Sequence, residues 1–342
     1  MKRLSEAEGI ELLEHGDPIE LGRLADARRR EIFDDTVTFI VDRNINYTNV
    51  CKNECKFCAF FRREGHKDAY LLTYDEILAK VRETVEAGGT QVMIQGGLYP
   101  DLGLDYYLKM LRLIRKNFPS ITIHSFTATE IQYFAQQEGI SVLECLKRLQ
   151  DAGLASLPGG GAEILVDEVR RKVSPKKIMT DDWLKVMEAA HSIGMESTAT
   201  MVIGLGETMA QRIEHMEKIR RLQDKAGGFR AFITWTYQPG NTELGGHKTS
   251  SWDYMKTLAL TRLYMDNIKH IQGSWVTQGE RIGQLTLGFG ADDLGSIMLE
   301  ENVVRAAGTN YEMSIQKMVD IIRGAGKQPA QRDTEYNIIR RF

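Results

Sequence analysis

Three cysteines stand close together in the segment CKNECKFCAF, at Cys51, Cys55 and Cys58. Their C-x3-C-x2-C spacing gathers three thiolates, one fewer than a closed tetrahedral metal site needs. A structural zinc site needs a fourth ligand, and the nearest histidine, His66, comes without a second ligand pair. A redox pair of the C-x2-C type has no use for Cys51. A [4Fe–4S] cluster held by three thiolates leaves one iron without a protein ligand, so the pattern favours such a cluster.

The rest of the composition narrows the class of protein. Clustered thiols are typical of a reducing compartment, and the polar start MKRLSEAEGIELLEHGD lacks the apolar stretch of a secretion signal. No apolar run approaches the roughly 18 residues of a membrane span. With 44 basic and 47 acidic residues, the chain lacks the basic footprint of a nucleic-acid or anionic-membrane binder. We therefore expect a cytoplasmic protein that binds neither, with Cys145 as a small buried side chain in a helix.

Short apolar runs alternate with amphipathic stretches through most of the chain. The runs typical of strands are 36–41, 90–94, 121–124, 154–157, 197–203, 230–235, 271–276 and, more weakly, 285–290. Helical signals lie between them, such as the capping box from Thr73 to Glu76 with a glycine stop at Gly88 and Gly89. This rhythm predicts an α/β fold, a (β/α)8 TIM-type barrel over 36–342 with C-terminal helices packed on it. Residues 1–35 form a predicted N-terminal helical extension.

Polar and glycine-rich segments follow the predicted strands. They are the cysteine segment, QGGLYPD, HSFTATE, PGGGAE, GLGET, TYQPGN, SWVTQGE and GADDLG. In a barrel of this type the chemistry sits at the carboxyl ends of the strands, where such loops meet. The sequence therefore predicts one functional rim assembled from many loops.

The cysteine pattern, with Phe57 directly before the last cysteine and a strand before the segment, resembles the radical S-adenosylmethionine (SAM) superfamily. The resemblance implies a radical SAM barrel in which the open iron chelates the amino and carboxylate groups of SAM. It also implies that one electron cleaves SAM to methionine and a 5′-deoxyadenosyl radical, which takes a hydrogen atom from a small-molecule substrate. That electron implies a low-potential donor, a flavodoxin or ferredoxin.

Longer segments resemble one group within that superfamily, the cyclases of the futalosine pathway of menaquinone biosynthesis. They are VDRNINYTNVCKNECKFCAFFR, IQGGLYPDLGLDYYLKMLRLIRKNFP, SLPGGGAEILVDEVRRKVSPKKI and TWTYQPGNT. The resemblance implies that dehypoxanthine futalosine loses its ribose C4′ hydrogen, that the carbon radical adds to the benzoate ring, and that an electron and a proton then leave. The alternatives are aminofutalosine synthase, the tyrosine-using subunit of deazaflavin (FO) synthase and, outside enzymes, a zinc-stabilised binding protein.

The resemblance also implies a set of cofactor contacts. The residues expected to contact SAM are Phe57, Gln95, Gly96, Gly97, Glu163 and Gly204. Phe57 and Gly204 would lie against adenine, the glycines after the second strand would let their backbone approach the methionine moiety, and Glu163 would accept from the ribose hydroxyls. Ordinary structural roles stay open as alternatives: loop packing, a tight turn, and a carboxylate at a helix start.

A second set of residues is expected to face the substrate. His124 and Glu130 are the proposed proton acceptors, and the expected substrate contacts are Ser125, Thr127, Asp292 and Asp293. The final step releases a ring proton, which an imidazole or a carboxylate can take near neutral pH. Structural hydrogen bonds and an Asx-turn are the alternatives. The benzoate carboxylate needs an arginine or a row of backbone donors, and the sequence does not single one out.

Overall fold

Eight strand positions close into a barrel in the computed structural model, which describes residues 2–342. One sheet has the order β10-β9-β1-β8-β7-β6-β5 and a second has the order β2-β3-β4. β1 continues into β2 across Val41, which joins the two sheets at one side. At the other side, bridges through Ser156 and Leu157 join β4 to β5. The ring is therefore complete and its neighbours are parallel, so the predicted (β/α)8 barrel is confirmed.

The barrel strands match most of the predicted runs. They are β1 (Thr36–Ile40), β2 (Asp42–Ile45), β3 (Gln91–Ile94), β4 (Thr122–Ser125), β5 (Ser197–Ile203), β6 (Phe229–Thr236), β7 (His270–Gln272) and β8 (Asp293–Ser296). The run 154–157 contributes only two bridges. The strand predicted at 285–290 is wrong, because this stretch ends a helix and then turns at Gly290, whose φ is +98°. The alternation of leucine with smaller residues imitates a strand there, although Leu285 is exposed.

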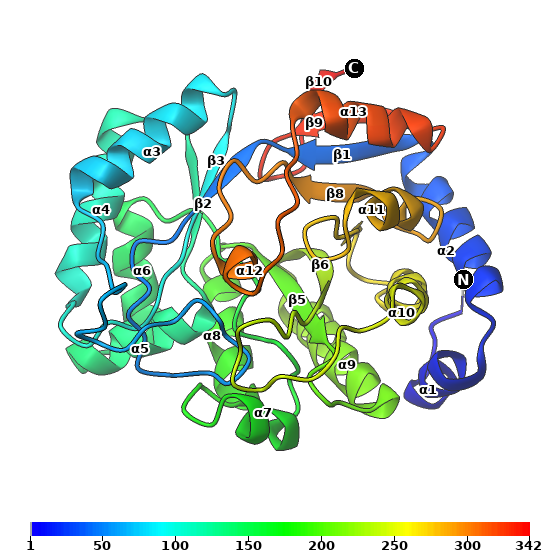
Figure 1. The fold of residues 1–342 in the computed structure, drawn as a ribbon, viewed down its shortest axis with the longest axis horizontal. Helices are drawn as coiled ribbons and strands as arrows, with labels where there is room; N and C mark the ends of the chain where they lie inside the picture. Colours follow the sequence, from blue (N-terminus) through cyan, green and yellow to red (C-terminus); the bar gives the residue numbers. More distant parts are fainter. Residues whose placement is uncertain (1) are drawn as a thin grey trace.

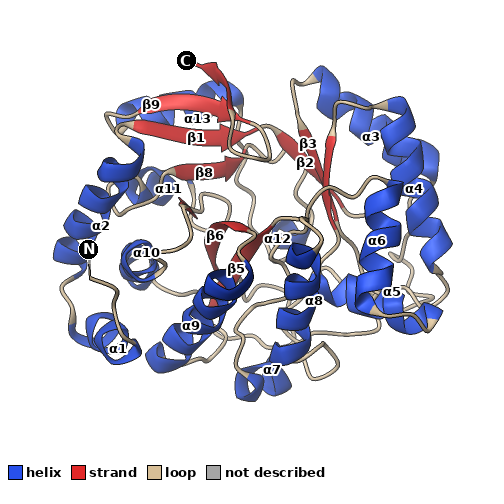
Figure 2. Ribbon diagram, turned by 180° about the vertical axis from the view of Figure 1, so that it is seen from behind, coloured by secondary structure: helices blue, strands red, loops and turns tan. Residues whose placement is uncertain are grey.

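Helices surround the strands on the outside of the barrel (Figures 1 and 2). They are α3 (Tyr74–Glu86), α4 (Leu104–Asn117), α5 (Ala128–Glu138), α6 (Val142–Ala152), α7 (Asp167–Val173), α8 (Thr180–Ser192), α9 (Met209–Ala226), α10 (Ser251–Tyr264), α11 (Glu280–Thr286) and α13 (Ile315–Gly324). The short helix α12 (Val303–Ala306) lies in the middle of the view instead, next to the interior of the barrel. The predicted capping box at Thr73 and Glu76 begins α3, which buries Ile77 and Val81. Cys145 is buried in α6, as expected. Within residues 2–342, no helix is long and apolar enough to cross a bilayer.

Two helices precede the first strand and pack on the outside of the barrel. They are α1 (Glu6–His15), which contacts α9, and α2 (Pro18–Phe33), which contacts α10. Figure 1 shows α2 and α10 side by side. Leu21 and Ala25 of α2 pack against Ala259 and Leu263 of α10 in an apolar cluster of their own. The N-terminal helices therefore cover barrel helices rather than the carboxyl rim.

The C-terminal segment closes the amino-terminal end of the barrel. β9 (Gln328–Arg332) pairs in parallel with β1, and β10 (Ile338–Arg341) returns antiparallel to β9. In the turn between them, the ring of Tyr336 stacks on His270 at 3.6 Å between centroids. The Arg332 guanidinium lies 3.8 Å from the Tyr336 ring centroid and binds both carboxylate oxygens of Asp293, at 2.6 and 3.0 Å. This cation and aromatic stack forms a floor that the sequence did not predict.

Asp292 and Asp293 belong to this floor and not to the rim. Both are buried and stand where β8 begins, because the strand lies after them and not before them. Asp292 binds the Arg262 guanidinium, His270 Nδ1 at 2.7 Å and the Ile271 peptide N–H at 2.8 Å. Burial raises the pKa of Asp292, but Arg262 and His270 outweigh it and leave that pKa below its usual value. The structure therefore does not bring these aspartates to the predicted substrate site.

The floor network predicts a large loss of stability when one partner is removed. Arg262→Met would leave the buried Asp292 charge without its main partner, and we expect the free energy of unfolding to fall by about 3–5 kcal/mol. Guanidinium denaturation of the purified protein measures this change. The matched control is Arg23→Met, which breaks an ion pair with Glu20 on the exposed face of α2 and should leave the unfolding midpoint nearly unchanged. Equal midpoints for both variants would contradict the role given to the floor.

Candidate functional site

Two cavities adjoin at the carboxyl end of the barrel. The rim cavity, of about 260 Å³, lies under the cysteine segment, and the lumen cavity, of about 250 Å³, runs down inside the strands. Both volumes suit small molecules. The residues that line both are Gln95, Gly160, Gly161, Glu163 and Val303. We call this set the shared wall, because its five residues border both cavities.

The cysteine loop forms one side of the rim cavity. Cys51, Cys55 and Cys58 all line the cavity, and none is in a disulfide. Backbone hydrogen bonds fix the loop, from Cys51 N–H to the Arg62 carbonyl at 3.1 Å and from Lys56 N–H to the Val173 carbonyl at 2.9 Å. Arg62 also donates to the carbonyls of residues 59–61. Sequence reasoning did not assign this clamp to Arg62, since an arginine beside a loop is usually a surface charge.

Burial raises the pKa of two of the three clustered thiols. Burial raises the pKa of the Cys55 thiol to about 12, against the opposing charge of Lys177. Burial also raises the pKa of Cys58, although the Phe61 and Phe60 peptide N–H groups oppose it. Such thiols become thiolates when metal supplies the missing positive charge. Within residues 2–342, no three Cys, His, Asp or Glu side chains are placed to hold a single metal ion.

The two glycines after β3 are needed by the cysteine loop itself. A Cβ on Gly97 would lie 2.1 Å from the Val50 carbonyl oxygen, and one on Gly96 would lie 2.7 Å from the Tyr47 ring. Gly97 N–H donates to the Thr48 carbonyl at 3.0 Å. Gln95, Gly96 and Gly97 all line the rim cavity. The glycines therefore let the end of β3 pack directly against the cysteine loop, in addition to any contact with SAM.

Glu130 ties this region together from α5. Its carboxylate accepts from the Thr127 N–H and hydroxyl at 2.8 and 2.9 Å, from Gly96 N–H at 3.0 Å and from the Tyr47 hydroxyl at 2.9 Å. Glu130 is 1% exposed and lines the rim cavity rather than the lumen. Burial raises its pKa, against these hydrogen bonds. Thr127 and Glu130 thus form a capping box at the start of α5, and Glu130 also positions the loop after β3. This is the structural role that was the alternative to proton transfer by Glu130.

Glu163 stands on the shared wall in a strained backbone conformation, with φ at +41°. Its Oε1 accepts from Lys177 Nζ at 2.8 Å, while its buried Oε2 has no hydrogen-bond partner within the described residues. The Lys177 ammonium also lies 5.6 Å from the centre of the Phe57 ring. Left-handed backbone at a residue other than glycine is uncommon, and it recurs at functional sites. Lys177 was missed from the sequence, where it is one of two adjacent lysines in SPKKI.

Two further predicted residues lie outside both cavities. Gly204 N–H is bound by the Glu207 carboxylate at 2.9 Å, and a Cβ on Gly204 would lie 2.3 Å from the Thr249 hydroxyl oxygen. Ser125 is fully buried, and its hydroxyl accepts from the Ile94 N–H at 3.1 Å. Other residues of the chain therefore already contact Gly204 and Ser125. Neither residue lines the rim cavity or the lumen cavity.

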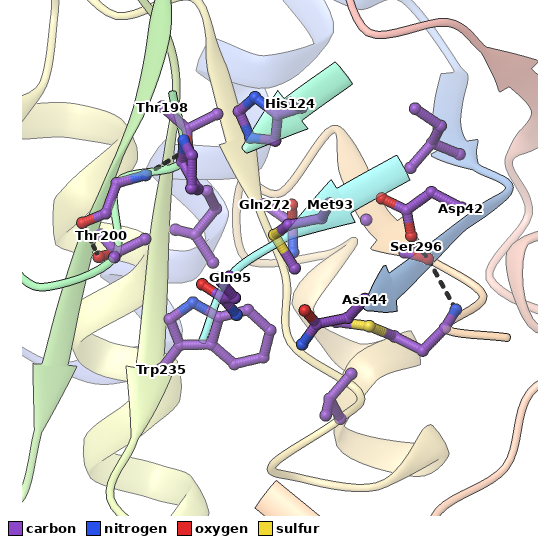
Figure 3. A pocket seen from close by; sticks show the side chains of 18 of the residues that line it. Asp42, Asn44, Met93, Gln95, His124, Thr198, Thr200, Trp235, Gln272 and Ser296 are labelled. Carbon is purple, nitrogen blue, oxygen red and sulfur yellow. Dashed lines mark hydrogen bonds between the residues drawn. The ribbon is translucent and has the colours of Figure 1, made fainter. Parts of the chain in front are cut away.

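The lumen cavity presents a mixed apolar and amide surface. Figure 3 shows the side chains that point into it from β2, β3, β4, β6 and β7: Asn44, Met93, Gln95, His124, Trp235 and Gln272. On β5, every second residue faces the cavity, namely Thr198, Thr200 and Val202. Aromatic and thioether groups suit a flat ring, and amides and hydroxyls suit a sugar or a ketone. The lumen can therefore hold a molecule that combines these parts.

His124 is the one predicted proton acceptor that lines the lumen. Its Nδ1 lies 2.7 Å from the Ser156 hydroxyl, which is itself buried. Burial, and then the charges of Arg230 and Arg332, lower the pKa of His124 well below its usual value. The ring is therefore neutral near pH 7. In the tautomer whose Nδ1–H donates to the Ser156 hydroxyl, Nε2 keeps a lone pair that can accept a proton, and the lowered pKa makes the ring a weak base.

Comparison with known proteins gives two family matches and close relatives. A model of the radical SAM superfamily matches residues 45–219, and a model described as the CofH/MqnC C-terminal region matches residues 226–341. A cyclic dehypoxanthine futalosine synthase of Halalkalibacterium halodurans is 46% identical, covering 100% of this chain and 93% of the relative. One of Streptomyces coelicolor is 47% identical, covering 98% and 85%. A 5-amino-6-(D-ribitylamino)uracil–L-tyrosine 4-hydroxyphenyl transferase of Archaeoglobus fulgidus is 42% identical, covering 94% of each.

Solved structures share the fold at low sequence identity. The hydrogenase maturase HydG of Carboxydothermus hydrogenoformans has a TM-score of 0.77 and 18% identity, covering 98% of this chain and 78% of the other. Methylornithine synthase (PylB) has a TM-score of 0.76 and 19% identity, covering 96% and 95%. At such identities the likeness shows the same barrel and carries no argument about substrate.

The neutral state of His124 is testable by nuclear magnetic resonance. We expect the ring nitrogen shifts of His124 to stay those of a neutral imidazole from pH 8 to pH 5.5, because burial and two nearby guanidinium groups disfavour the charged form. Protein labelled with ¹⁵N-histidine gives the measurement. Arg230→Gln removes one of those charges and should raise the pKa of His124 toward its usual value. A wild-type midpoint near pH 6.5 would contradict the assignment.

Proposed function

The chain belongs to the radical SAM superfamily, among relatives of cyclic dehypoxanthine futalosine synthase, and on that premise we propose that it cyclises dehypoxanthine futalosine. The observation that carries the proposal is the identity of 46–47% with two such synthases over nearly the whole chain. The 42% identity with the tyrosine-using transferase makes that activity the second candidate. The two adjoining cavities support either reaction, since both need a cofactor and a substrate side by side.

The rim cavity fits the cofactors of this superfamily. Cys51, Cys55 and Cys58 would hold a [4Fe–4S] cluster, and the cavity beside them would hold SAM. When bound, these groups supply the radical that takes a hydrogen atom from the substrate. Glu163, whose Oε2 has no hydrogen-bond partner among the described residues and lies 3.6 Å from Arg170 Nη1, would accept from the ribose hydroxyls, and Phe57 would lie beside adenine. The peptide groups of Gln95 to Gly97 would meet the methionine moiety.

The lumen residues would orient the substrate and receive its proton. Met93 and Trp235 offer apolar surface to the benzoate ring, and Asn44 and Gln272 offer hydrogen bonds. The ribose end would lie at the shared wall, next to the rim cavity. Cyclisation leaves a ring proton to be removed, and His124 Nε2 would accept it while Nδ1 stays bound to Ser156.

A low-potential protein would supply the electron. The outer surface of the cysteine loop carries the exposed side chains of Lys56 and Arg63, and that of Lys176 lies close by; Lys56 pairs with Glu243, and the other two pair with Glu54. Flavodoxin or ferredoxin, the expected donors, would approach at this surface because it lies over the cluster site.

Cluster ligation predicts a specific loss of iron. Cys51→Ala, Cys55→Ala and Cys58→Ala should each lose most of the protein-bound iron and sulfide and the broad absorbance near 400 nm, because two thiolates cannot hold the cube. Iron and sulfide assays on anaerobically reconstituted protein measure this. Cys145→Ala is the matched control, a buried cysteine in α6 away from both cavities, and should keep its iron. Equal iron in all four variants would contradict the ligand assignment.

Substrate identity is decided by turnover. The reduced, reconstituted protein with SAM should form 5′-deoxyadenosine and a product lighter by two hydrogens from dehypoxanthine futalosine. It should be inactive with the aminofutalosine precursor, and with tyrosine plus 5-amino-6-(D-ribitylamino)uracil. Mass spectrometry reads all three reactions. Turnover only with another substrate would overturn the cyclase proposal and keep the radical chemistry.

A further inference from the structure

Arg230 is placed in the lumen by an irregularity of β6. The adjacent residues Ser197 and Thr198 of β5 pair with Phe229 and Ala231 of β6, so Arg230 is an extra residue in a β-bulge. A bulge redirects a side chain that regular alternation would point elsewhere, and bulges are frequent beside active sites. Arg230 lines the lower part of the lumen cavity, together with Arg332 and Tyr336 of the floor.

The Arg230 charge is poorly compensated. Its side chain is 10% exposed, and its buried Nε has no hydrogen-bond partner within residues 2–342. The one hydrogen bond found for its guanidinium runs from Nη1 to Glu196 at 3.5 Å, and the Glu196 side chain is half exposed. Burial lowers the pKa of Arg230, and Glu196 opposes that shift. A buried guanidinium normally has its donors satisfied, so this one lacks a partner.

The other arginine of the floor shows the contrast. Arg332 has both Nε and Nη2 bound by the Asp293 carboxylate. The groups that act electrostatically on Arg230 are Glu196, Tyr336, Arg332 and Glu335. Arg332 is neutralised by its own aspartate, and His124 is neutral. The Nε and Nη2 edge of Arg230 is therefore the free donor pair of this part of the lumen.

We propose that Arg230 binds the carboxylate of the substrate, side-on through Nε and Nη2. A planar guanidinium edge matches a carboxylate in two parallel hydrogen bonds. The identity of the carboxylate as that of the benzoate ring rests on the proposed function. With this end fixed near the floor, the aromatic ring lies beside His124 and the ribose extends toward the shared wall. Arg230 is thus the residue that sets both the orientation of the substrate and the selection of an acidic ring.

The experiment compares two ligands on three proteins. The ligands are dehypoxanthine futalosine and its carboxamide counterpart, in which –CONH₂ replaces –COO⁻. The proteins are wild type, Arg230→Gln and Arg43→Gln, each as anaerobic holoprotein with SAM but without reductant, so that no turnover occurs. Arg43 is the matched control, because it is 12% exposed with an unbonded Nε but pairs with Glu83 and Glu300 away from the lumen. Calorimetric titration gives each Kd.

We expect wild type and Arg43→Gln to bind the carboxylate at least about tenfold more tightly than the carboxamide. Arg230→Gln should weaken carboxylate binding by about 30-fold or more and leave carboxamide binding nearly unchanged. Equal affinity of wild type for both ligands overturns the inference without any variant, so a poorly folded variant does not leave it untested. Parallel weakening of both ligands in Arg230→Gln also overturns it, as a structural effect.

The same experiment separates this inference from the proposed function. Suppose that the wild-type protein converts dehypoxanthine futalosine on reduction and that Arg230→Gln binds this substrate with an unchanged Kd. This result would refute the contact between Arg230 and the carboxylate and would retain the proposal that the protein is the cyclase. Wild type that neither binds nor converts this substrate refutes both. Restoration of part of the carboxylate preference in Arg230→Lys would support a charge contact, since lysine keeps the charge but not the two-pronged geometry.

Discussion

The buried carboxylate of Glu130 holds together the parts of the chain on which the rim cavity depends. It binds Tyr47 beyond the first barrel strand, Gly96 beyond the second and Thr127 at the start of α5. These hydrogen bonds fix the loop after β3, and that loop in turn contacts the cysteine loop so closely that only glycine fits at position 97. A carboxylate that meets four donors in a low-dielectric interior has little freedom to move. The three cysteines therefore face the cavity from a rigid base, which a site for a cluster requires.

The two ends of the barrel use buried charge in opposite ways. At the floor, Asp292 and Asp293 each meet an arginine, so their charges are balanced within the chain and the barrel is closed. Around the cavities, the Nε of Arg230 has no hydrogen-bond partner in the described part of the chain, the Oε2 of Glu163 has only the Arg170 charge at 3.6 Å, and His124 is neutral. Buried polar atoms without partners cost stability, and they persist where a ligand completes them. Whether a buried polar group has a partner within the chain therefore separates binding groups from structural ones better than the residue type does.

Much of the fold and of the rim could be predicted from the sequence, because local patterns carry that information. Strand runs, a capping box and the cysteine spacing all lie within short segments, and the residues of the cysteine loop and of Gln95 to Gly97 lie where the barrel rule puts them. Asp292 was misplaced because the helix before it imitates a strand, which shifted the strand by several residues and moved the aspartates from the floor to the rim. The clamp by Arg62, the pair of Lys177 with Glu163 and the bulge at Arg230 depend on contacts between segments far apart or on strand register, which local patterns do not encode.

The shared wall would place the cofactor and the substrate in separate cavities of one barrel and still keep them close enough to react. Gly160 and Gly161 carry no side chain there, while Gln95 and Glu163 each line both cavities. A thin wall lets a reactive group pass over a short distance, and the side chains around it exclude water on both sides. Tyr336 and Arg332 line the other end of the lumen, so the side that meets the cofactor and the side that meets the floor are built from different segments of the chain.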